Sequence, residues 1–334
     1  MAEPSPFEWR LRAPTLEDFD GIVAMAAARA DRLRSPTRPT REGWRRWWEG
    51  QVPTLSANHR VAVDRAGQVV GLASVNPASE PFLIVLANVS VGPDHWDHEP
   101  LWDALSAWVV ERAAANVHLA PPDAEVNLMA EAVESDVPRT AALTRAGFKR
   151  TRVFFRMRID FDGDVEAAPS PAGVEVRRID MERELLDVAR VHAEAFRDHW
   201  GHAEQSPESF AEEWRHDTIG QRTDFNYIAV ADGGVVGYVL CEDNYRGDPA
   251  IGLVSYLGVR PAWRQRGIAR ALLETAFQTL RAQGYAAARL GVDATSPTGA
   301  LRLYEKVGMR AIEQVNRYER VLRPGIDVRP RPGG

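Results

Sequence analysis

The strongest constraint on the fold of this chain is that its sequence repeats. The segment VAVDRAGQVVGLASV at 61–75 matches IAVADGGVVGYVLC at 228–241, and each is typical of an alternating strand, a glycine-containing turn and a second strand. Further on, LTRAGF at 143–148 matches YEKVGM at 304–309, and each is typical of a helix that ends at glycine. A length of 334 residues suffices for two domains of about 150 residues, each with its own core. We therefore predict that one fold occurs twice along the chain.

The segment DGDVEAAPSPAG at 162–173 separates the two repeats. It is acidic and then rich in proline and small residues, which is typical of a linker. We predict an N-terminal domain at 7–163, a linker at 164–173, a C-terminal domain at 174–323 and a disordered, Pro/Arg/Gly-rich tail at 324–334. The mixture of strand and helix patterns predicts the α/β (α+β) class, with a mixed, mostly antiparallel sheet flanked by helices in each domain.

Composition excludes several classes of function. A net charge of -6 argues against a protein that neutralises nucleic-acid phosphates or lies on anionic lipid. No apolar run is long enough to span a membrane, the first residues do not resemble a secretory signal, and Cys241 is the only cysteine. These features predict a cytoplasmic monomer or homodimer that binds neither nucleic acid, membrane nor metal.

The most informative stretch is GLVSYLGVRPAWRQRGIARALLETAFQTLRAQG at 252–284. An apolar strand to Val259 leads into a glycine-containing loop and then into a helix with an apolar stripe that ends at Gly284. The free N–H groups and the dipole at the start of a helix favour an anion, and the arginines at 264, 266 and 270 add positive charge. Taken alone, this pattern fits a phosphate site and an ordinary solvated turn equally well.

The order R-x-x-G-x-A after this strand, followed by DATSPTGALRLYEKVGM at 293–309, resembles the GNAT superfamily of acetyltransferases. The resemblance is specific over 227–322 and persists as a degraded echo over 7–161. It implies acetyl-CoA as co-substrate and a bulged, splayed strand whose backbone contacts the pantetheine arm. The residues that it assigns to the arm are Leu257, Gly258 and Val259, and those that it assigns to the pyrophosphate are Arg264, Gln265, Arg266, Gly267, Ile268, Ala269 and Arg270.

The resemblance also implies residues for the chemistry. Ser296 precedes a proline at the predicted start of a helix, where many relatives have an asparagine that bonds the cofactor arm. Tyr304 follows on the same helix, and the family places such a hydroxyl beside the thioester sulfur as general acid, although a structural tyrosine is the alternative. Relatives often carry a glutamate on the central strand as general base, whereas this strand has no carboxylate. Glu242 is our candidate for that role, directly or through a water, with Asp243 and Asp293 as weaker ones, and a solvated turn residue is the alternative for each.

Two further predictions concern the acceptor and the N-terminal copy. His199 and Trp200 lie in the early helical region that shapes the acceptor pocket of these enzymes, and they are our candidates for substrate contact. In the N-terminal copy, DHEPL at 97–101 replaces RQRGI at 264–268, so two basic residues become acidic and the glycine becomes proline. Leu143 replaces Tyr304. We predict that this copy has no catalytic activity.

The function that the resemblance implies is acetyl transfer from acetyl-CoA to a primary amine of a small molecule, through direct attack in a ternary complex in the C-terminal domain. Tandem members of the superfamily include the mycothiol synthases, whose active copy is also C-terminal, so a cysteinyl amine is an alternative acceptor. A protein amine as acceptor and a non-catalytic acyl-CoA-binding regulator both stay open at this point. An intact loop and Tyr304 favour the enzyme.

Overall fold

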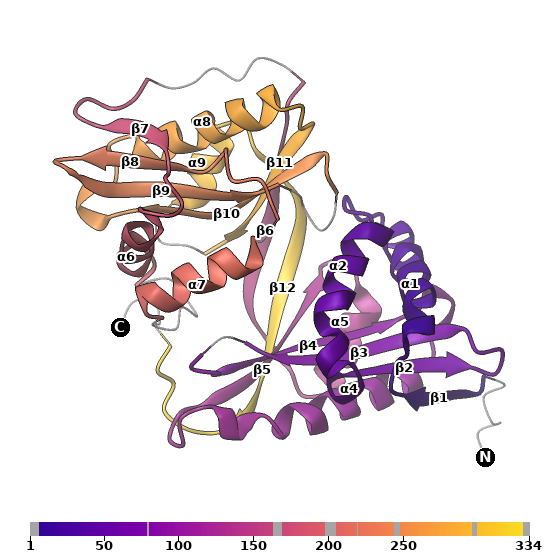
Figure 1. Ribbon diagram of the computed structural model, residues 1–334. Helices are drawn as coiled ribbons and strands as arrows, with labels where there is room; N and C mark the ends of the chain where they lie inside the picture. The colour runs from indigo at the N-terminus through magenta and orange to yellow at the C-terminus, as the bar shows by residue number, and fades with distance from the viewer. Residues whose placement is uncertain are drawn as a thin grey trace. The chain divides into compact units, whose positions relative to one another are not determined.

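The computed structural model describes residues 7–78, 80–162, 169–197, 205–218, 220–243, 248–295 and 299–329 (Figure 1). The strands are β1 (Trp9–Arg12), β2 (His59–Asp64), β3 (Val69–Pro77), β4 (Ile84–Val91), β5 (Val126–Val133), β6 (Lys149–Asp160), β7 (Glu175–Arg178), β8 (Tyr227–Ala231), β9 (Gly234–Glu242), β10 (Ile251–Val259), β11 (Ala287–Asp293) and β12 (Arg310–Arg323). The α-helices are α1 (Phe19–Arg32), α2 (Arg41–Gln51), α3 (Leu55–Asn58), α4 (Glu99–Ala114), α5 (Val137–Arg145), α6 (Leu185–Phe196), α7 (Pro207–Asp217), α8 (Ile268–Ala282) and α9 (Ala300–Lys306). These elements form two units, the first of Met1–Phe154 with Glu313–Val328 and the second of Phe155–Ile312 with Arg329–Gly334.

Both units have the same strand topology. The hydrogen-bonded order is β1-β2-β3-β4-β5-β12 in the first unit and β7-β8-β9-β10-β11-β6 in the second. In each unit the first four strands pair antiparallel and the fourth and fifth pair parallel. A parallel pair needs a long crossover connection, which α4 provides in the first unit and α8 in the second. The prediction of a mixed, mostly antiparallel sheet flanked by helices is confirmed.

The last strand of each sequence repeat completes the sheet that the other repeat begins. β6 follows α5 in the sequence but lies beside β11, and the N–H of Phe161, just after β6, donates to the Ala286 carbonyl at 2.9 Å. β12 follows α9 but pairs with β5, from Val315 opposite Val133 to Arg323 opposite Val126 (Figure 1). This exchange was not predicted from the sequence, because residue alternation indicates that a strand forms but not which edge it joins.

The segment after β12 differs from the disordered tail that we expected. The N–H of Ile326 donates to the Asp123 carbonyl at 2.8 Å, and the Ile326 carbonyl accepts from the N–H of Glu125 at 2.9 Å. Ile326 thereby forms an isolated parallel bridge with Ala124. The expectation of disorder is therefore wrong for this part of the tail, because polar backbone groups beside β5 find partners there.

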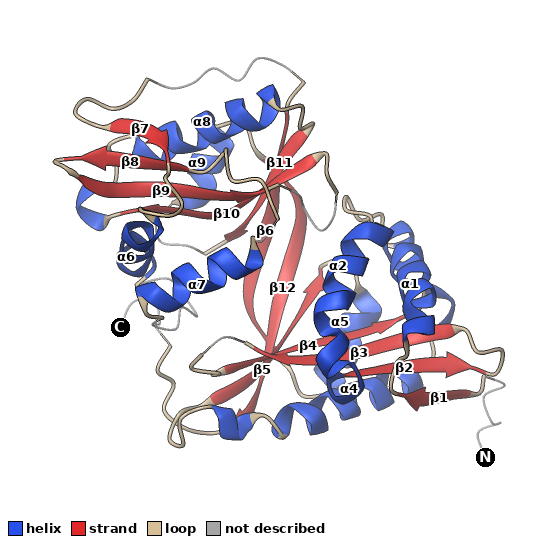
Figure 2. Cartoon of the chain, in the orientation of Figure 1, coloured by secondary structure: helices blue, strands red, loops and turns tan. Residues whose placement is uncertain are grey.

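In the second unit, helices cover both faces of the sheet (Figure 2), and each face carries an apolar cluster. One face carries the larger cluster, in which α8 packs against the inner side chains of β8, β9 and β10. The other face packs against α6 and α7. Alternation decides the face of each side chain: Val239 and Cys241 on β9 lie in the α8 cluster, whereas Tyr238 and Leu240 lie in the α6/α7 cluster.

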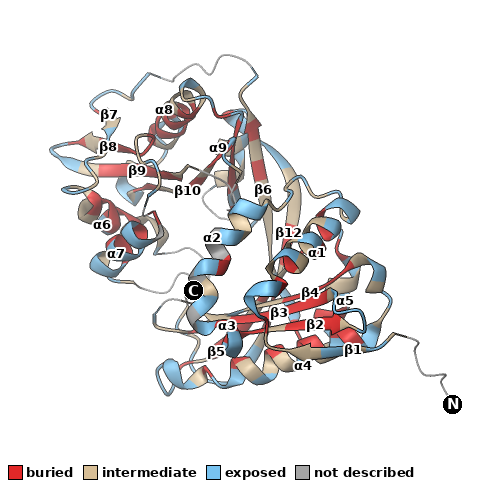
Figure 3. Cartoon of the chain, turned by 45° about the vertical axis from the view of Figure 1, so that its right-hand side comes forward, coloured by how far each residue is buried: buried red, intermediate tan, exposed pale blue. Residues whose placement is uncertain are grey.

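The first unit is held together by the corresponding helices. On α4, Leu101, Leu105 and Val109 are fully buried at spacings of four residues, which places them on one stripe of the helix. Figure 3 shows the buried residues gathered on the strands and on the inner sides of the helices. Burial of this stripe gives the first unit a core of its own.

Substitutions on β12 test whether the part of this strand from Glu313 onward is structural in the first unit. Val315 is 4% exposed and Val321 is 47% exposed, and both pair with β5. We expect Val315→Ala to lower the free energy of unfolding by about 2 kcal/mol, because two buried carbon groups are lost. Val321→Ala is the matched control and should change it by less than about 0.5 kcal/mol.

Amide hydrogen exchange measures which part of the chain loses stability. Val315→Ala should speed exchange along β5, Val126–Val133, more than along β10, Ile251–Val259. Faster exchange confined to β10 would contradict the assignment of this part of β12 to the first unit.

Candidate active site

The central feature of the second unit is a strand that has lost one of its neighbours. β10 pairs with β11 only over Ile251, Gly252 and Leu253, whereas its antiparallel pairing with β9 continues to Val259. The β9 register shifts by one residue between Val254 and Tyr256, so Ser255 is an extra residue in a β-bulge. Beyond the bulge, the β11 side of β10 has no strand partner in the described residues. Backbone groups there are positioned to pair with an extended ligand, as a further strand would.

The strand ends in a loop with two left-handed residues. Gln265 has φ of +64° and Gly267 has φ of +81°. The conformation suits glycine but is strained for glutamine, and such strain concentrates at functional loops. A Cβ at Gly267 would lie 3.8 Å from Pro171. Alternation of this kind turns successive N–H groups toward one side, which makes a concave anion site.

The N–H groups of this loop are available to a ligand. Gly267 is the N-cap of α8 and makes no side-chain capping hydrogen bond. The first helical N–H with a protein acceptor is that of Ala271, which donates to the Gly267 carbonyl at 3.0 Å, and among the described residues no acceptor serves the N–H groups of 265–270. Exposed N–H donors at the positive end of a fifteen-residue helix fit a diphosphate.

The three arginines of the motif have different environments. Arg264 donates to the carbonyls of Ala195 at 2.9 Å and Val259 at 3.3 Å, so it ties the loop to α6. The Arg266 guanidinium lies over the Trp263 ring at 4.7 Å. Arg270 pairs with Glu274 at 2.7 Å. Arg264 therefore holds the loop in place, whereas Arg266 lies on an aromatic platform beside the N–H groups.

Packing against the core positions Ile268 and Ala269. Ile268 is 1% exposed and lies in the α8 cluster, which fixes the first turn of the helix. Ala269 is partly buried against the same cluster. Val259 of β10 is buried in the same cluster and Leu257 packs partly against it, so the backbone of these residues is the part that a ligand would pair with.

Tyr304 lies on α9 and packs against the α8 cluster. Burial raises the pKa of its hydroxyl to about 12. The phenol is therefore protonated throughout the neutral range, which is the form that a general acid requires. Tyr304 thus packs against the core and carries its proton at neutral pH, whereas its raised pKa makes it a weaker acid than an ordinary tyrosine.

Glu242 ends β9 on the same face as Tyr238 and Leu240, the face that α6 and α7 cover. Its Oε1 accepts a hydrogen bond from the Ser255 hydroxyl at 2.5 Å. Glu242 was a candidate from the sequence, whereas Ser255, which the bulge turns toward it, was missed. Asp293 has a different role, because its Oδ1 accepts from both the N–H and the hydroxyl of Thr295 at 2.8 Å in a local turn.

Three predicted site residues, Ser296, His199 and Trp200, lie outside the described residues. In the described part of the segment 293–309, α9 begins at Ala300. The residue before it, Gly299, has φ of +70°. His199 and Trp200 belong to the segment of the sequence between α6 and α7.

Sequence reasoning also missed a buried pair on the α6/α7 face. His192 Nδ1 and the Tyr238 hydroxyl lie 2.6 Å apart, and the two residues are 7% and 0% exposed. Both positions have the spacing of ordinary core residues, so no local signal in the sequence distinguishes them. Only the pairing of β9 with β10 and the packing of α6 bring them to the site.

The corresponding strand of the first unit shows the same separation without the bulge. β4 pairs with β5 from Ile84 to Ala87, and its register with β3 is continuous from Val85 to Val91. The helix that follows provides its own cap, because His98 Nδ1 accepts from the N–H of Leu101 at 3.2 Å. Pro100 also lacks an N–H in this first turn. Fewer donors therefore remain here for an anion.

A buried arginine occupies the end of β4. Arg29 on α1 is 6% exposed and donates to the Val91 carbonyl at 2.5 Å. It also pairs with Asp136, which is the N-cap of α5. The tip of the guanidinium lies within 6 Å of the Trp96 and Trp102 rings, at 5.5 and 5.8 Å. The Arg29 side chain thus links β4 to the start of α5. The corresponding parts of the second unit are the open side of β10 and the region before α9.

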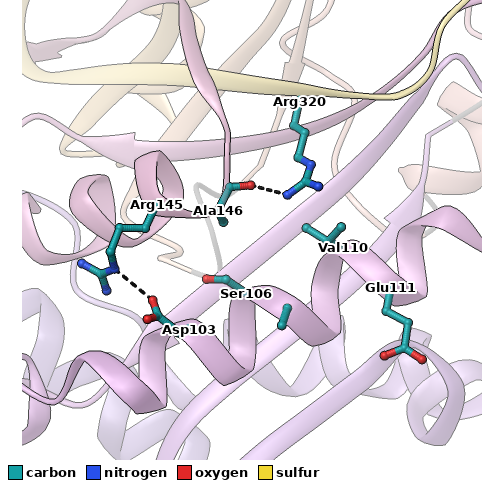
Figure 4. A pocket seen from close by; sticks show the side chains of 8 residues that line it. Asp103, Ser106, Val110, Glu111, Arg145, Ala146 and Arg320 are labelled. Atoms are coloured by element: carbon teal, nitrogen blue, oxygen red, sulfur yellow. Dashed lines mark hydrogen bonds and ion pairs between the residues drawn. The ribbon is translucent and has the colours of Figure 1, made fainter.

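Other features of the first unit fit an inactive copy. Leu143, which aligns with Tyr304, is fully buried and brings no polar group. A pocket of about 440 Å³ lies beside α4 (Figure 4), and three of its charged side chains are engaged, since Arg145 pairs with Asp103 at 3.0 Å and Arg320 donates to the Ala146 carbonyl. This geometry carries no ligand assignment.

Comparison with known proteins agrees with this geometry. The acetyltransferase (GNAT) family matches residues 185–309. The mycothiol acetyltransferase of Frankia alni is 30% identical over 313 residues, which cover 87% of this chain and 88% of that protein. The mycothiol acetyltransferase of Stackebrandtia nassauensis is 28% identical over 317 residues, which cover 93% and 97%.

Solved structures agree over the whole length. The crystal structure of a GCN5-related N-acetyltransferase from Sphaerobacter thermophilus has a TM-score of 0.83 and 27% identity, and the match covers 96% of this chain and 98% of that one. A tandem GNAT protein from the clavulanic acid biosynthesis pathway has a TM-score of 0.69 and 16% identity, over 96% and 100%, which shows likeness of fold alone.

The fold, the split sheet and these matches together define an N-acetyltransferase. The chain belongs to the GNAT family, in which it is a tandem member with two copies of the fold.

The described residues offer neither a membrane span nor a metal site. None of their helices is long and apolar enough to cross a membrane. They also contain no group of three or more His, Cys, Asp or Glu side chains placed to hold a metal ion.

The buried pair in the first unit predicts a large effect on stability. Arg29→Ala should lower the free energy of unfolding by about 3–5 kcal/mol, because it leaves the Asp136 carboxylate buried without its cation. Arg38→Ala is the control: Arg38 pairs with Asp31 of α1, but the two side chains are 68% and 57% exposed. Its loss should cost less than about 1 kcal/mol.

Chemical denaturation of both variants measures the difference. If both variants lost the same free energy of unfolding, Arg29 would not be a buried partner of Asp136. The inference that this pair occupies the site position in the first unit would then be wrong.

Proposed function

We propose that the second unit transfers an acetyl group from acetyl-CoA to a primary amine of a small molecule, by direct attack in a ternary complex. The observation that carries the proposal is the half of β10 without a strand partner, which leads into a loop whose N–H groups from 265 to 270 lack acceptors among the described residues. An extended amide arm that ends in a diphosphate matches this arrangement in order and in chemistry.

In the proposed complex, the backbone of Leu257, Gly258 and Val259 pairs with the pantetheine arm. The pyrophosphate lies on the N–H groups of Gln265 to Arg270, and the Arg266 guanidinium, on its Trp263 platform, adds charge. Arg264 holds the loop against α6 and so contributes to cofactor binding by positioning the loop. Ser296 is proposed to contact the arm, and His199 and Trp200 the acceptor, as the family resemblance implies.

Tyr304 is proposed as the general acid. When the amine attacks the thioester carbonyl, the C–N bond forms, the C–S bond breaks and a thiolate leaves. The pKa of Tyr304, which burial raises to about 12, leaves the phenol protonated at neutral pH, so it has a proton to give to this thiolate. This residue favours an enzyme over a non-catalytic acyl-CoA-binding regulator, since simple binding needs no acid.

Glu242 is proposed as the general base. It lies on the face of the sheet that α6 and α7 cover, which is the face assigned to the acceptor. The Ser255 hydroxyl donates to its carboxylate at 2.5 Å, which orients the carboxylate beside the bulge. A base on β9 then substitutes for the glutamate that relatives often carry on the central strand, directly or through one water.

For the acceptor we propose a cysteinyl amine of the kind acetylated in mycothiol synthesis. The support is that mycothiol acetyltransferases of Stackebrandtia nassauensis and Frankia alni align with 93% and 87% of this chain. The panel for its test contains L-cysteine methyl ester, S-methyl-L-cysteine methyl ester, glucosamine and a lysine peptide. Fastest turnover of the lysine peptide would replace this acceptor class by a protein amine.

Two substitutions separate cofactor binding from chemistry. We expect Arg266→Glu to weaken acetyl-CoA binding about 10- to 100-fold, because it places a negative charge beside the diphosphate. We expect Tyr304→Phe to bind normally but to lower kcat by about 100- to 10,000-fold, because the leaving thiolate loses its acid. Calorimetric titration and thiol release against the panel measure the two effects.

Two controls use the same residue types away from the site. Arg183→Glu changes an arginine whose side chain is 86% exposed, and Tyr227→Phe removes a buried hydroxyl that bonds Thr279. Both should bind and turn over like the parent chain. Binding at two sites, or unaltered binding by Arg266→Glu, would sink the assignment of one cofactor site in the second unit.

The base has its own test. Glu242→Gln should lower kcat by about 100-fold or more and leave acetyl-CoA binding unchanged, since an amide cannot take a proton. Ser255→Ala should give a smaller loss, roughly tenfold, because it removes only the orienting hydrogen bond. If kcat of the Gln variant equals that of the parent at every pH, Glu242 is not the base.

A further inference from the structure

The last turn of α6 contacts both ends of the turn that joins β10 to the proposed pyrophosphate loop. This turn is a short 3₁₀ segment, Pro261–Trp263, with Arg260 before it and Arg264 after it. Arg260 Nη1 lies 2.6 Å from Glu194 Oε1, and Arg264 Nη2 donates to the Ala195 carbonyl at 2.9 Å. Two neighbouring residues of one helix therefore hold the two residues that flank the turn.

The same two arginines are also bonded to the sheet. Arg260 donates through Nε to the Val235 carbonyl and through its backbone N–H to the Val236 carbonyl, both at 2.9 Å. Arg264 Nε donates to the Val259 carbonyl at 3.3 Å. The bond from Arg264 to α6 satisfies one of the carbonyl groups that the end of a helix leaves without a partner in the helix. The turn is thus held between β9, β10 and α6.

The loop after the turn has a conformation that needs such support. Gln265 has a left-handed backbone with φ of +64°, which is strained for a residue that has a Cβ. Strain of this kind persists only where the surrounding contacts hold the backbone in place. Among the described residues no acceptor serves the N–H groups of 265–270, so these donors do not fix the loop themselves.

The conformation of this loop decides how tightly a diphosphate binds. Only a loop that presents its N–H groups together forms the anion site. An apparent dissociation constant rises in inverse proportion to the fraction of molecules that have the binding conformation. Contacts that hold the turn therefore strengthen binding without touching the ligand.

We propose that Glu194 is a positioning residue for the cofactor. Through Arg260 it holds the turn, and with the turn the loop, in the conformation that binds the diphosphate. A carboxylate repels a diphosphate, so the affinity that Glu194 contributes is indirect. The proposal rests on the proposed acetyl-CoA site and adds to it a residue of α6 that does not touch the cofactor.

The sign of the effect distinguishes this role from simple electrostatics. Removal of a negative charge near an anion site favours the anion, by less than about twofold at physiological ionic strength. Removal of a contact that holds the loop disfavours it. We expect Glu194→Ala to weaken acetyl-CoA binding about three- to tenfold in calorimetric titration, and to leave kcat at saturating acetyl-CoA unchanged.

S-Acetylpantetheine locates the effect within the cofactor. This compound has the thioester and both amide groups of the arm but no diphosphate, so it does not use the loop. With acetyl-CoA, Glu194→Ala should lower kcat/KM for thiol release by the same factor of about three to ten. With S-acetylpantetheine, kcat/KM of the variant should equal that of the parent chain.

Glu184→Ala is the matched control. Glu184 is the residue before α6, at the opposite end of the helix, and it pairs with Arg177 at 2.6 Å. Its loss weakens the anchoring of the same helix but leaves both contacts to the turn, so acetyl-CoA should bind as in the parent. Arg260→Ala provides a second control, because Glu194 has lost its partner there. In that background Glu194→Ala should cause no further loss of affinity.

Several results overturn the positioning role. Glu194→Ala that binds acetyl-CoA as tightly as the parent, or more tightly, contradicts it. An equal loss with S-acetylpantetheine, an equal loss in Glu184→Ala, or a further loss in the Arg260→Ala background would each place the effect outside the contact between Glu194 and Arg260. A parent chain that binds no acetyl-CoA contradicts the proposed cofactor site as well, whereas parental binding with an unaffected Glu194→Ala variant contradicts only the positioning role.

Discussion

The site depends on the separation of β10 from β11 after Leu253. A strand inside a sheet ordinarily uses all of its N–H and C=O groups, and leaving a row of them without partners is costly unless solvent or a ligand takes them up. Here the separation coincides with a bulge at Ser255, and the loop that follows adds helix N–H groups without acceptors in the described part of the chain. The open side of β10 and this loop together form the surface on which we propose that an extended, anion-ended ligand binds. The packing of Ile268 and the hydrogen bonds of Arg264 hold that surface in place.

The first unit shows what happens to the same fold when these groups are used internally. Its fourth strand also separates from the fifth, after Ala87. Arg29 bonds the end of this strand and pairs with Asp136, and His98 caps the following helix. A buried guanidinium that pairs with a carboxylate contributes to stability only while both partners are present. The first unit thus has an internal network where the second unit has an open surface, and its sequence has neither the arginine-glycine loop nor the tyrosine at the aligned positions.

Much of the architecture could be predicted because it is local. The strand–turn–strand repeats and the apolar stripe of the helix after Gly267 follow from residue spacing, and the structure has elements at those places. The loop from Arg264 to Arg270 could be identified for the same reason, since glycine and arginine beside a helix start have a direct physical meaning. The roles of Tyr304 and Glu242 were suggested by resemblance and by position at a strand end. The structure adds the environment of each: a partly buried phenol with a raised pKa, and a carboxylate that accepts from Ser255.

What the sequence by itself determined is therefore the repeat, the class of fold, the order of the elements and the loop at the start of α8. Those features depend on residues a few positions apart, where periodicity and turn chemistry act directly. Only the tertiary structure decided that β6 and β12 each complete the sheet that the other repeat begins, that Arg29 meets Asp136, and that His192 meets Tyr238. These contacts join residues far apart in the chain, and alternation of apolar and polar residues does not encode which edge or partner a segment meets. The physical reason is that local patterns fix the face of a side chain, whereas its partner is fixed by strand pairing and helix packing across the whole unit.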